Sequence, residues 1–131
     1  MAISGGRIIG EMCHFLDLMR FIVGYPIKSY HVMASADGRK LETDRSVSLT
    51  VQFEDGSMGT VHYFTNGARR FQKERLEVFC GNATLRLNNF VSLVGYGWPG
   101  FKKKRLFRQD KGHKACINSF INSVRFRTES P

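Results

Sequence analysis

Glu11, Cys13 and His14 place an acid, a thiol and an imidazole side by side in an otherwise apolar segment, GGRIIGEMCHFLDLMRF. Apolar residues recur around them at the spacing of a helix face, which predicts a helix over 7–23. At about 100° per residue, Arg7, Glu11 and His14 fall in one narrow sector of that helix. An imidazole exchanges a proton near neutral pH, and a carboxylate one turn away can orient it. The stripe therefore either faces water as an ordinary polar face or lines a cleft as an acid–base pair.

The spacing of apolar residues changes along the chain, and these changes predict the elements that must position this stripe. Gly24 and Pro26 end the first helix. Alternating apolar and polar residues then predict strands at 27–36, 45–53, 58–66, 74–80 and 83–89, and a further strand or loop at 90–97. Asp55-Gly56 and Gly81-Asn82 close two hairpins, the first over 46–66, and the GWPG sequence that follows 90–97 must be irregular.

A second helix is expected to be capped by Asp110 and to end near Arg127, with Cys116, Ile117, Phe120, Ile121 and Val124 on one stripe. The order of elements predicts an α+β fold. Its core is an open, predominantly antiparallel sheet with helices on one face. The other face would be free for oligomer packing. It carries small polar and aromatic residues: Ser46, Ser48, Thr50, Gln52, Thr60, His62 and Phe64.

Composition limits the class of protein. A chain of 131 residues with 42% hydrophobic content predicts one globular domain over 1–131. No apolar run is long enough to span a membrane and the start lacks a signal pattern, which together predict a cytoplasmic protein. The widely spaced Cys13, Cys80 and Cys116 predict reduced core thiols rather than disulfides, and no metal site is expected.

The formal net charge of +9 draws attention to the segment 101–114. Its cations are Lys102, Lys103, Lys104, Arg105, Arg108, Lys111 and Lys114. This segment is either a solvated strand and loop or a site for an anionic small molecule. Because no familiar nucleic-acid motif surrounds it, nucleic acid is the least favoured partner.

Four stretches together resemble the C-terminal domain of the Gfo/Idh/MocA oxidoreductases: GGRIIGEMCHFLDLMRFIVG, FEDGSMGTVHYF, KERLEVFCGNATLRLNNF and QDKGHKACINSFI. The resemblance implies a nicotinamide-linked dehydrogenase that acts on sugars, cyclitols or nucleotide-linked sugars. It also implies a sheet that mediates a homodimer or higher oligomer. His14 matches the family histidine and takes over its role as acid–base or substrate ligand. Many relatives have an aspartate four residues earlier, where this chain has Gly10, so Glu11 replaces it with altered geometry.

Relatives also carry a Rossmann domain, which has a G-x-G-x-x-G phosphate loop and a Glu-Lys-Pro motif. We expect this domain, its loop and its motif to be absent from this chain. We therefore expect a domain excised from a longer parent. NAD or NADP would bind the missing Rossmann half of that parent, and no cofactor is expected on this chain.

The sequence thus predicts the substrate-binding and oligomerisation half of a dehydrogenase, inactive alone. His14 and Glu11 are its candidate catalytic residues. The candidate substrate-binding residues are Arg7, His14, Lys102, Lys103 and Lys104. The alternatives are a non-catalytic interaction domain and, less favoured, an anion-binding or nucleic-acid-binding domain.

Overall fold

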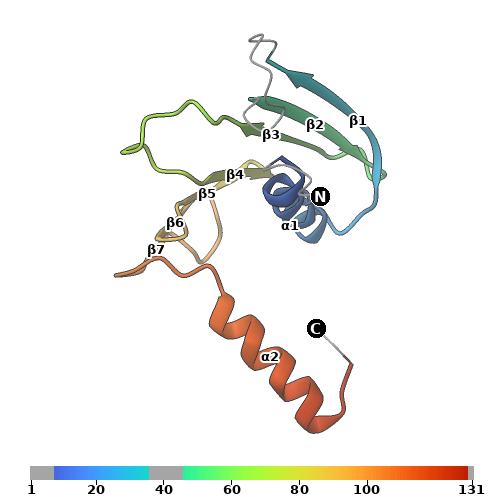
Figure 1. Cartoon of the computed structure of the whole chain (residues 1–131). Coiled ribbons are helices and arrows are strands. Elements are labelled where there is room, and N and C mark those ends of the chain that lie inside the picture. Colours follow the sequence, from blue (N-terminus) through green and yellow to red (C-terminus); the bar gives the residue numbers. More distant parts are fainter. Residues whose placement is uncertain (1–7, 36–45, 130–131) are drawn as a thin grey trace. The chain divides into compact units, whose positions relative to one another are not determined.

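The computed structural model describes residues 8–35 and 46–129. These residues form two compact units that divide between Arg69 and Arg70. Each unit contains one antiparallel sheet and one α-helix (Figure 1). The predicted α+β fold is therefore confirmed, with the strands hydrogen-bonded into two sheets. That 1–131 acts as one domain remains a prediction.

The first unit begins with a π-helical turn, η1 (Ile8–Met12), that continues into helix α1 (Cys13–Val23). Strands β1 (Ile27–Ala34), β2 (Val47–Phe53) and β3 (Met58–Tyr63) follow in the spatial order β1-β2-β3. Both pairings are antiparallel, and Gly56 occupies the predicted β2–β3 turn with a φ of 88°. The helix end is also as predicted, because Gly24 has a φ of 77° and its N–H bonds the Arg20 carbonyl at 2.8 Å.

The core of this unit lies between β2 and α1. Alternate residues of β2 are buried, and Val51 and Phe53 are almost wholly inaccessible. The helix contributes Phe15, Leu16, Met19 and Val23, and η1 contributes the buried Met12. Ile22 of the same helix is 41% exposed. Gly59 of β3 lets the helix approach, since a Cβ there would collide with the sulfur of Met19.

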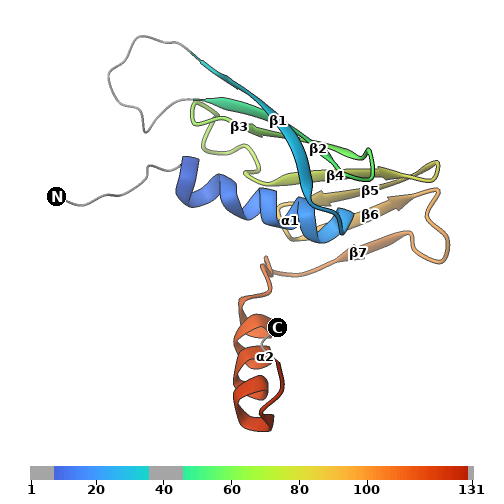
Figure 2. The same cartoon turned by 90° about the vertical axis from the view of Figure 1, so that its right-hand side faces the viewer.

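The second unit comprises β4 (Arg75–Cys80), β5 (Ala83–Asn88), β6 (Ser92–Tyr96), β7 (Lys103–Arg105) and α2 (His113–Phe126). The four strands are antiparallel and lie in chain order (Figure 2). One face carries the apolar, half-buried Leu76, Val78, Leu85, Leu87 and Leu93. The opposite face is charged and aromatic.

Left-handed residues close the first two turns of this sheet. Gly81 and Asn82 close β4 and β5 with φ values of 56° and 61°, as expected for a tight hairpin. Asn89 and Phe90 close β5 and β6 with φ values of 48° and 51°, although neither is glycine. The segment before α2 holds this second turn: the Asp110 N–H bonds the Phe90 carbonyl at 3.2 Å.

Helix α2 begins two residues later than predicted, because its N-cap is Gly112 in place of Asp110. Asp110 accepts a hydrogen bond from the Gly112 N–H at 2.8 Å. Asp110 therefore stabilises the turn before the helix and is not its cap. The end at Phe126, with Arg127 as C-cap, is as predicted. The predicted stripe of Ile117, Phe120, Ile121 and Val124 is more than half exposed.

The three cysteines are free and exposed. The expectation that they are core thiols is wrong. Their positions explain the error. Cys13 lies off the side of α1 that packs on the core, Cys116 belongs to the exposed stripe of α2, and Cys80 ends β4 beside the exposed hairpin turn.

Candidate functional site at the start of helix α1

The π turn sets the geometry at the start of α1. Its sequence, IIGEM, contains two β-branched residues and a glycine, which are weak α-helix formers. A π turn holds more residues than an α turn, and such turns are frequent at functional sites. Here Met12 enters the core with 5% of its surface exposed, while the neighbouring Glu11 is exposed.

Glu11 is fixed by a tyrosine from the sheet. The Tyr63 hydroxyl donates a hydrogen bond to Glu11 Oε2 at 2.7 Å, a short distance typical of a charged acceptor. Tyr63 is the last residue of β3, is half-buried and packs against the core. The sequence analysis missed it. The signal was its spacing of two from the buried Val61, which puts both side chains on the face that α1 covers.

His14 lies in the first turn of α1 with an exposed side chain. The Cys13 thiol beside it contacts the Gly10 carbonyl oxygen at 3.7 Å. The Glu11 carboxylate accepts a hydrogen bond from Tyr63, and no hydrogen bond or ion pair within the described chain joins Glu11 to His14. Arg7, the third member of the predicted stripe, lies outside the described residues.

The predicted lysines belong to the second unit. Lys103 and Lys104 are in β7, Lys102 precedes it, and all three side chains are exposed. Because side chains alternate along a strand, Lys103 and Lys104 project from opposite faces. The run of lysines is therefore divided by the sheet and does not form one cluster.

The open face of the first sheet is neutral and internally hydrogen-bonded. The Ser48 hydroxyl bonds His62 Nδ1 at 2.9 Å, and the hydroxyls of Thr50 and Thr60 are 3.3 Å apart. The rings of His62 and Phe64 stack with centroids 5.6 Å apart. Met33 and Met58 also project from this face and are 67% and 75% exposed. Ser48, Thr50, Thr60, His62 and Phe64 were expected on this face, whereas the two methionines were not.

A model of the GFO/IDH/MocA C-terminal domain matches residues 1–86. The chain belongs to the Gfo/Idh/MocA family. Domains of this family typically occur in oxidoreductases. The match includes the first unit, β4 and the hairpin to β5, and 87–131 lies beyond it. No curated protein and no solved structure gives a match.

The expectation that this Gfo/Idh/MocA domain lacks the G-x-G-x-x-G spacing is wrong: Gly95, Gly97 and Gly100 have it. Their surroundings do not form a phosphate loop. A Cβ on Gly95 would lie 2.9 Å from the Phe101 carbonyl oxygen, so the glycine is needed for local packing. The segment leads from β6 into β7 and not into a helix.

The domain's residues do not fit a nicotinamide dinucleotide. That cofactor binds a parallel βαβ unit, and every strand pairing in 8–35 and 46–129 is antiparallel. Within the same residues, no group of three His, Cys, Asp or Glu side chains could hold a metal ion. No helix of the described chain has the length and apolar character needed to cross a membrane.

Proposed function

We propose that this domain is the substrate-binding and oligomerisation half of a cytoplasmic NAD(P)-dependent dehydrogenase. Its substrate class is a sugar, a cyclitol or a nucleotide-linked sugar. Membership of the Gfo/Idh/MocA family carries the proposal. The exposed His14 and the fixed Glu11 at the start of α1 support it, because a polyol substrate needs groups that exchange protons and hydrogen bonds with hydroxyls.

His14 is the proposed proton acceptor. A secondary hydroxyl must lose its proton when its carbon is oxidised, and an accessible imidazole can take that proton. Glu11 is the proposed positioning residue. Its carboxylate is held by Tyr63 next to the first turn of α1, from where it would accept a hydrogen bond from a substrate hydroxyl and orient that hydroxyl toward His14. The nicotinamide, when bound to residues outside this chain, would supply the hydride acceptor.

Arg7 and the lysines of 102–104 are each proposed as substrate-binding residues, and each cation would serve an anionic substrate such as a nucleotide-linked sugar. The exposure of the lysines supports this role, since exposed ammonium groups can contact phosphates. A neutral sugar would need none of them, so the effect of these residues distinguishes the two substrate classes.

Self-association is the second part of the proposal. The open face of the first sheet has small polar residues that would let two sheets approach, and Met33, Met58 and Phe64 offer apolar area that gains from burial. A twofold dimer is the simplest closed arrangement of a self-complementary face. Light scattering on the chain should give a mass of two or more copies at tens of micromolar.

The experiment that tests the catalytic part is His14→Ala in the complete enzyme. Turnover should fall about 100-fold to 10,000-fold while the melting temperature stays unchanged. Asp17→Ala is the matched control, because Asp17 is also exposed on α1 and has no proposed role. A folded His14→Ala enzyme with nearly normal turnover would reject the role of His14 and favour a non-catalytic interaction domain. Saturable, tight binding of NADH to this chain alone would reject the assignment of the cofactor to other residues.

A further inference from the structure

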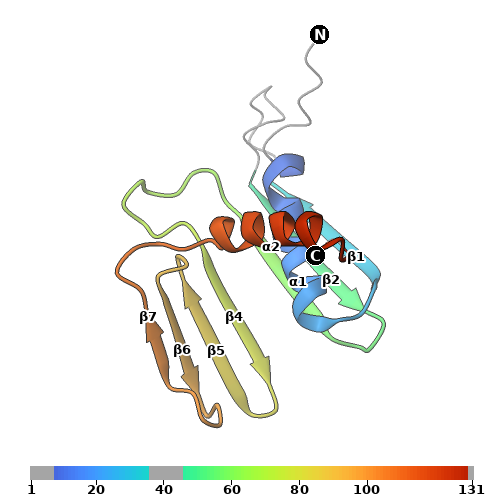
Figure 3. The same cartoon turned by 90° about the horizontal axis from the view of Figure 1, so that it is seen from below.

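Strand β7 forms an edge of the four-stranded sheet (Figure 3). It pairs with β6 on one side only, and its residues, Lys103, Lys104 and Arg105, are all cationic and exposed. The strand also lies beyond the residues 1–86 that match the family.

The hydrogen bonds of β6 and β7 show which backbone groups face outward. The Gly95 N–H bonds the Lys102 carbonyl, and the Leu106 N–H bonds the Val91 carbonyl, both at 2.8 Å. In an antiparallel pair, hydrogen-bonded residues alternate with residues whose backbone groups point away. Lys104 therefore bonds β6, whereas Lys103 and Arg105 direct their N–H and C=O groups to the outer edge. No hydrogen bond within the described chain occupies that edge.

The side chains of Lys103 and Arg105 lie on one face of the sheet. Lys103 is opposite Val94, and Val94 is opposite Arg86 on the next strand. Arg86 Nε bonds Glu77 Oε1 at 2.9 Å, so this face already holds one carboxylate. Neither Lys103 nor Arg105 has a carboxylate partner in the described chain.

We propose that the outer edge of β7 binds an extended acidic segment of a partner protein as a fifth strand. An added strand would bond the backbone groups of Lys103 and Arg105, and its residues opposite them would project onto the same face. Acidic side chains at two alternate positions of that strand would thus lie beside the two cations, at the distance of cross-strand neighbours. A second copy of this chain is a poor occupant, because its 20 Lys and Arg outnumber its 11 Asp and Glu.

The probe is a capped peptide, Thr-Thr-Glu-Thr-Glu-Thr-Thr, added to the intact chain. Amide hydrogen exchange read by NMR should slow at Lys103 and Arg105, whose N–H groups become bonded. Exchange at Lys104 should change little, because its N–H already bonds β6. Loss of binding when both glutamates of the peptide are N-methylated would show that the backbone pairs. An unchanged affinity would overturn the proposal.

Two variants of equal charge separate strand addition from general attraction to a basic surface. Lys103→Glu should weaken the peptide about tenfold, whereas Lys104→Glu, on the opposite face, should weaken it less than about threefold. A peptide with adjacent glutamates should bind about fivefold less tightly than the alternating one, because one acid then faces the wrong side. Equal effects of the two variants, or tighter binding of single-stranded oligothymidylate, would overturn the proposal and leave a solvated, charged edge.

Discussion

Helices α1 and α2 are both amphipathic, but of these two described helices α1 alone packs its apolar side against a buried core. Phe15, Leu16 and Met19 of α1 pack against the buried strand β2. The stripe of α2 has similar spacing, yet Phe120 and Val124 are 57% and 64% exposed. An apolar stripe therefore predicts that a helix needs a partner, while the partner depends on what the tertiary structure offers.

The sheets of the two units differ in the charge of their polar faces. The open face of the first sheet pairs neutral groups with each other, as in Thr50 with Thr60. The polar face of the second sheet pairs charges, as in Arg75 and Arg86 with Glu77, and places Arg86 over the ring of Tyr96 at 5.6 Å. A neutral face can meet its own copy without repulsion, whereas a cationic face requires a partner of opposite charge.

The largest expected difference between the units is in core stability. Phe53→Ala should lower the free energy of unfolding by about 3–5 kcal/mol, because Phe53 is 0% exposed and its removal leaves a cavity. Ile121→Ala, on the stripe of α2, should cost less than about 1 kcal/mol, since Ile121 is 53% exposed. Urea denaturation of the three proteins checks both values. Similar losses would show that the α2 stripe is packed in solution.

The next effect concerns self-association. Thr50→Arg puts a charge in the middle of the neutral face and should weaken the proposed dimer at least about tenfold, since two like charges would meet across the twofold axis. Thr84→Arg makes the same change on the charged face of the second sheet and should leave the dimer intact. Light scattering over a dilution series measures both. A dimer insensitive to Thr50→Arg would place its interface elsewhere.

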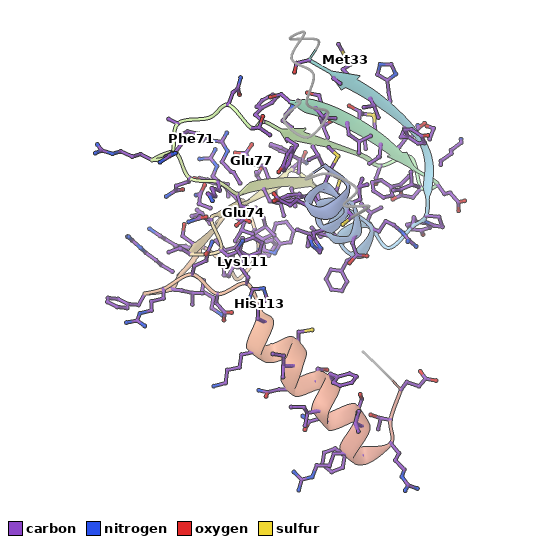
Figure 4. All side chains as sticks on the ribbon, viewed as in Figure 1. Met33, Phe71, Glu74, Glu77, Lys111 and His113 are labelled. Atoms are coloured by element: carbon purple, nitrogen blue, oxygen red, sulfur yellow. The ribbon has the colours of Figure 1, made fainter. Side chains whose placement is uncertain are left out.

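The smallest effect is expected at the ion pair that joins Glu74 and Lys111 before α2 (Figure 4). Glu74→Gln should cost about 0.5 kcal/mol, because both side chains are partly exposed and solvent screens the pair. The melting temperature in low salt measures this loss, and 1 M salt should reduce it. A loss that persists in high salt would mean that Glu74 acts through its hydrogen bond with Gln109.

Periodic patterns predicted most of the fold. The alternation over 46–53 placed Val47, Leu49 and Val51 on the buried face, and the turns at Asp55-Gly56 and Gly81-Asn82 were predicted from residue types alone. These features depend on neighbours in sequence, which is why they could be foreseen. The start of α2 was misplaced because Asp110 can form either a cap or the turn before one.

The candidate site was less predictable because it joins residues far apart in sequence. Glu11 contacts Tyr63 only because α1 packs across β3. The π turn that precedes α1 could not be predicted either, because the analysis of periodicity assumes the constant pitch of an α-helix. The run of lysines at 102–104 was expected to act together. A strand divides it between two faces, and only the pairing with β6 shows which cations are neighbours.

The left-handed turn at Asn89 and Phe90 has a consequence for the order in which the second unit folds. A left-handed backbone conformation raises the free energy by about 1–2 kcal/mol for residues other than glycine and asparagine. The β5–β6 hairpin therefore gains little from its turn until the Asp110 and Leu106 N–H groups bond the Phe90 and Val91 carbonyls. The β4–β5 hairpin, with glycine in its turn, needs no such help and should form first. Pulsed hydrogen exchange during refolding should show protection in β4 and β5 before β6, and simultaneous protection would contradict this order.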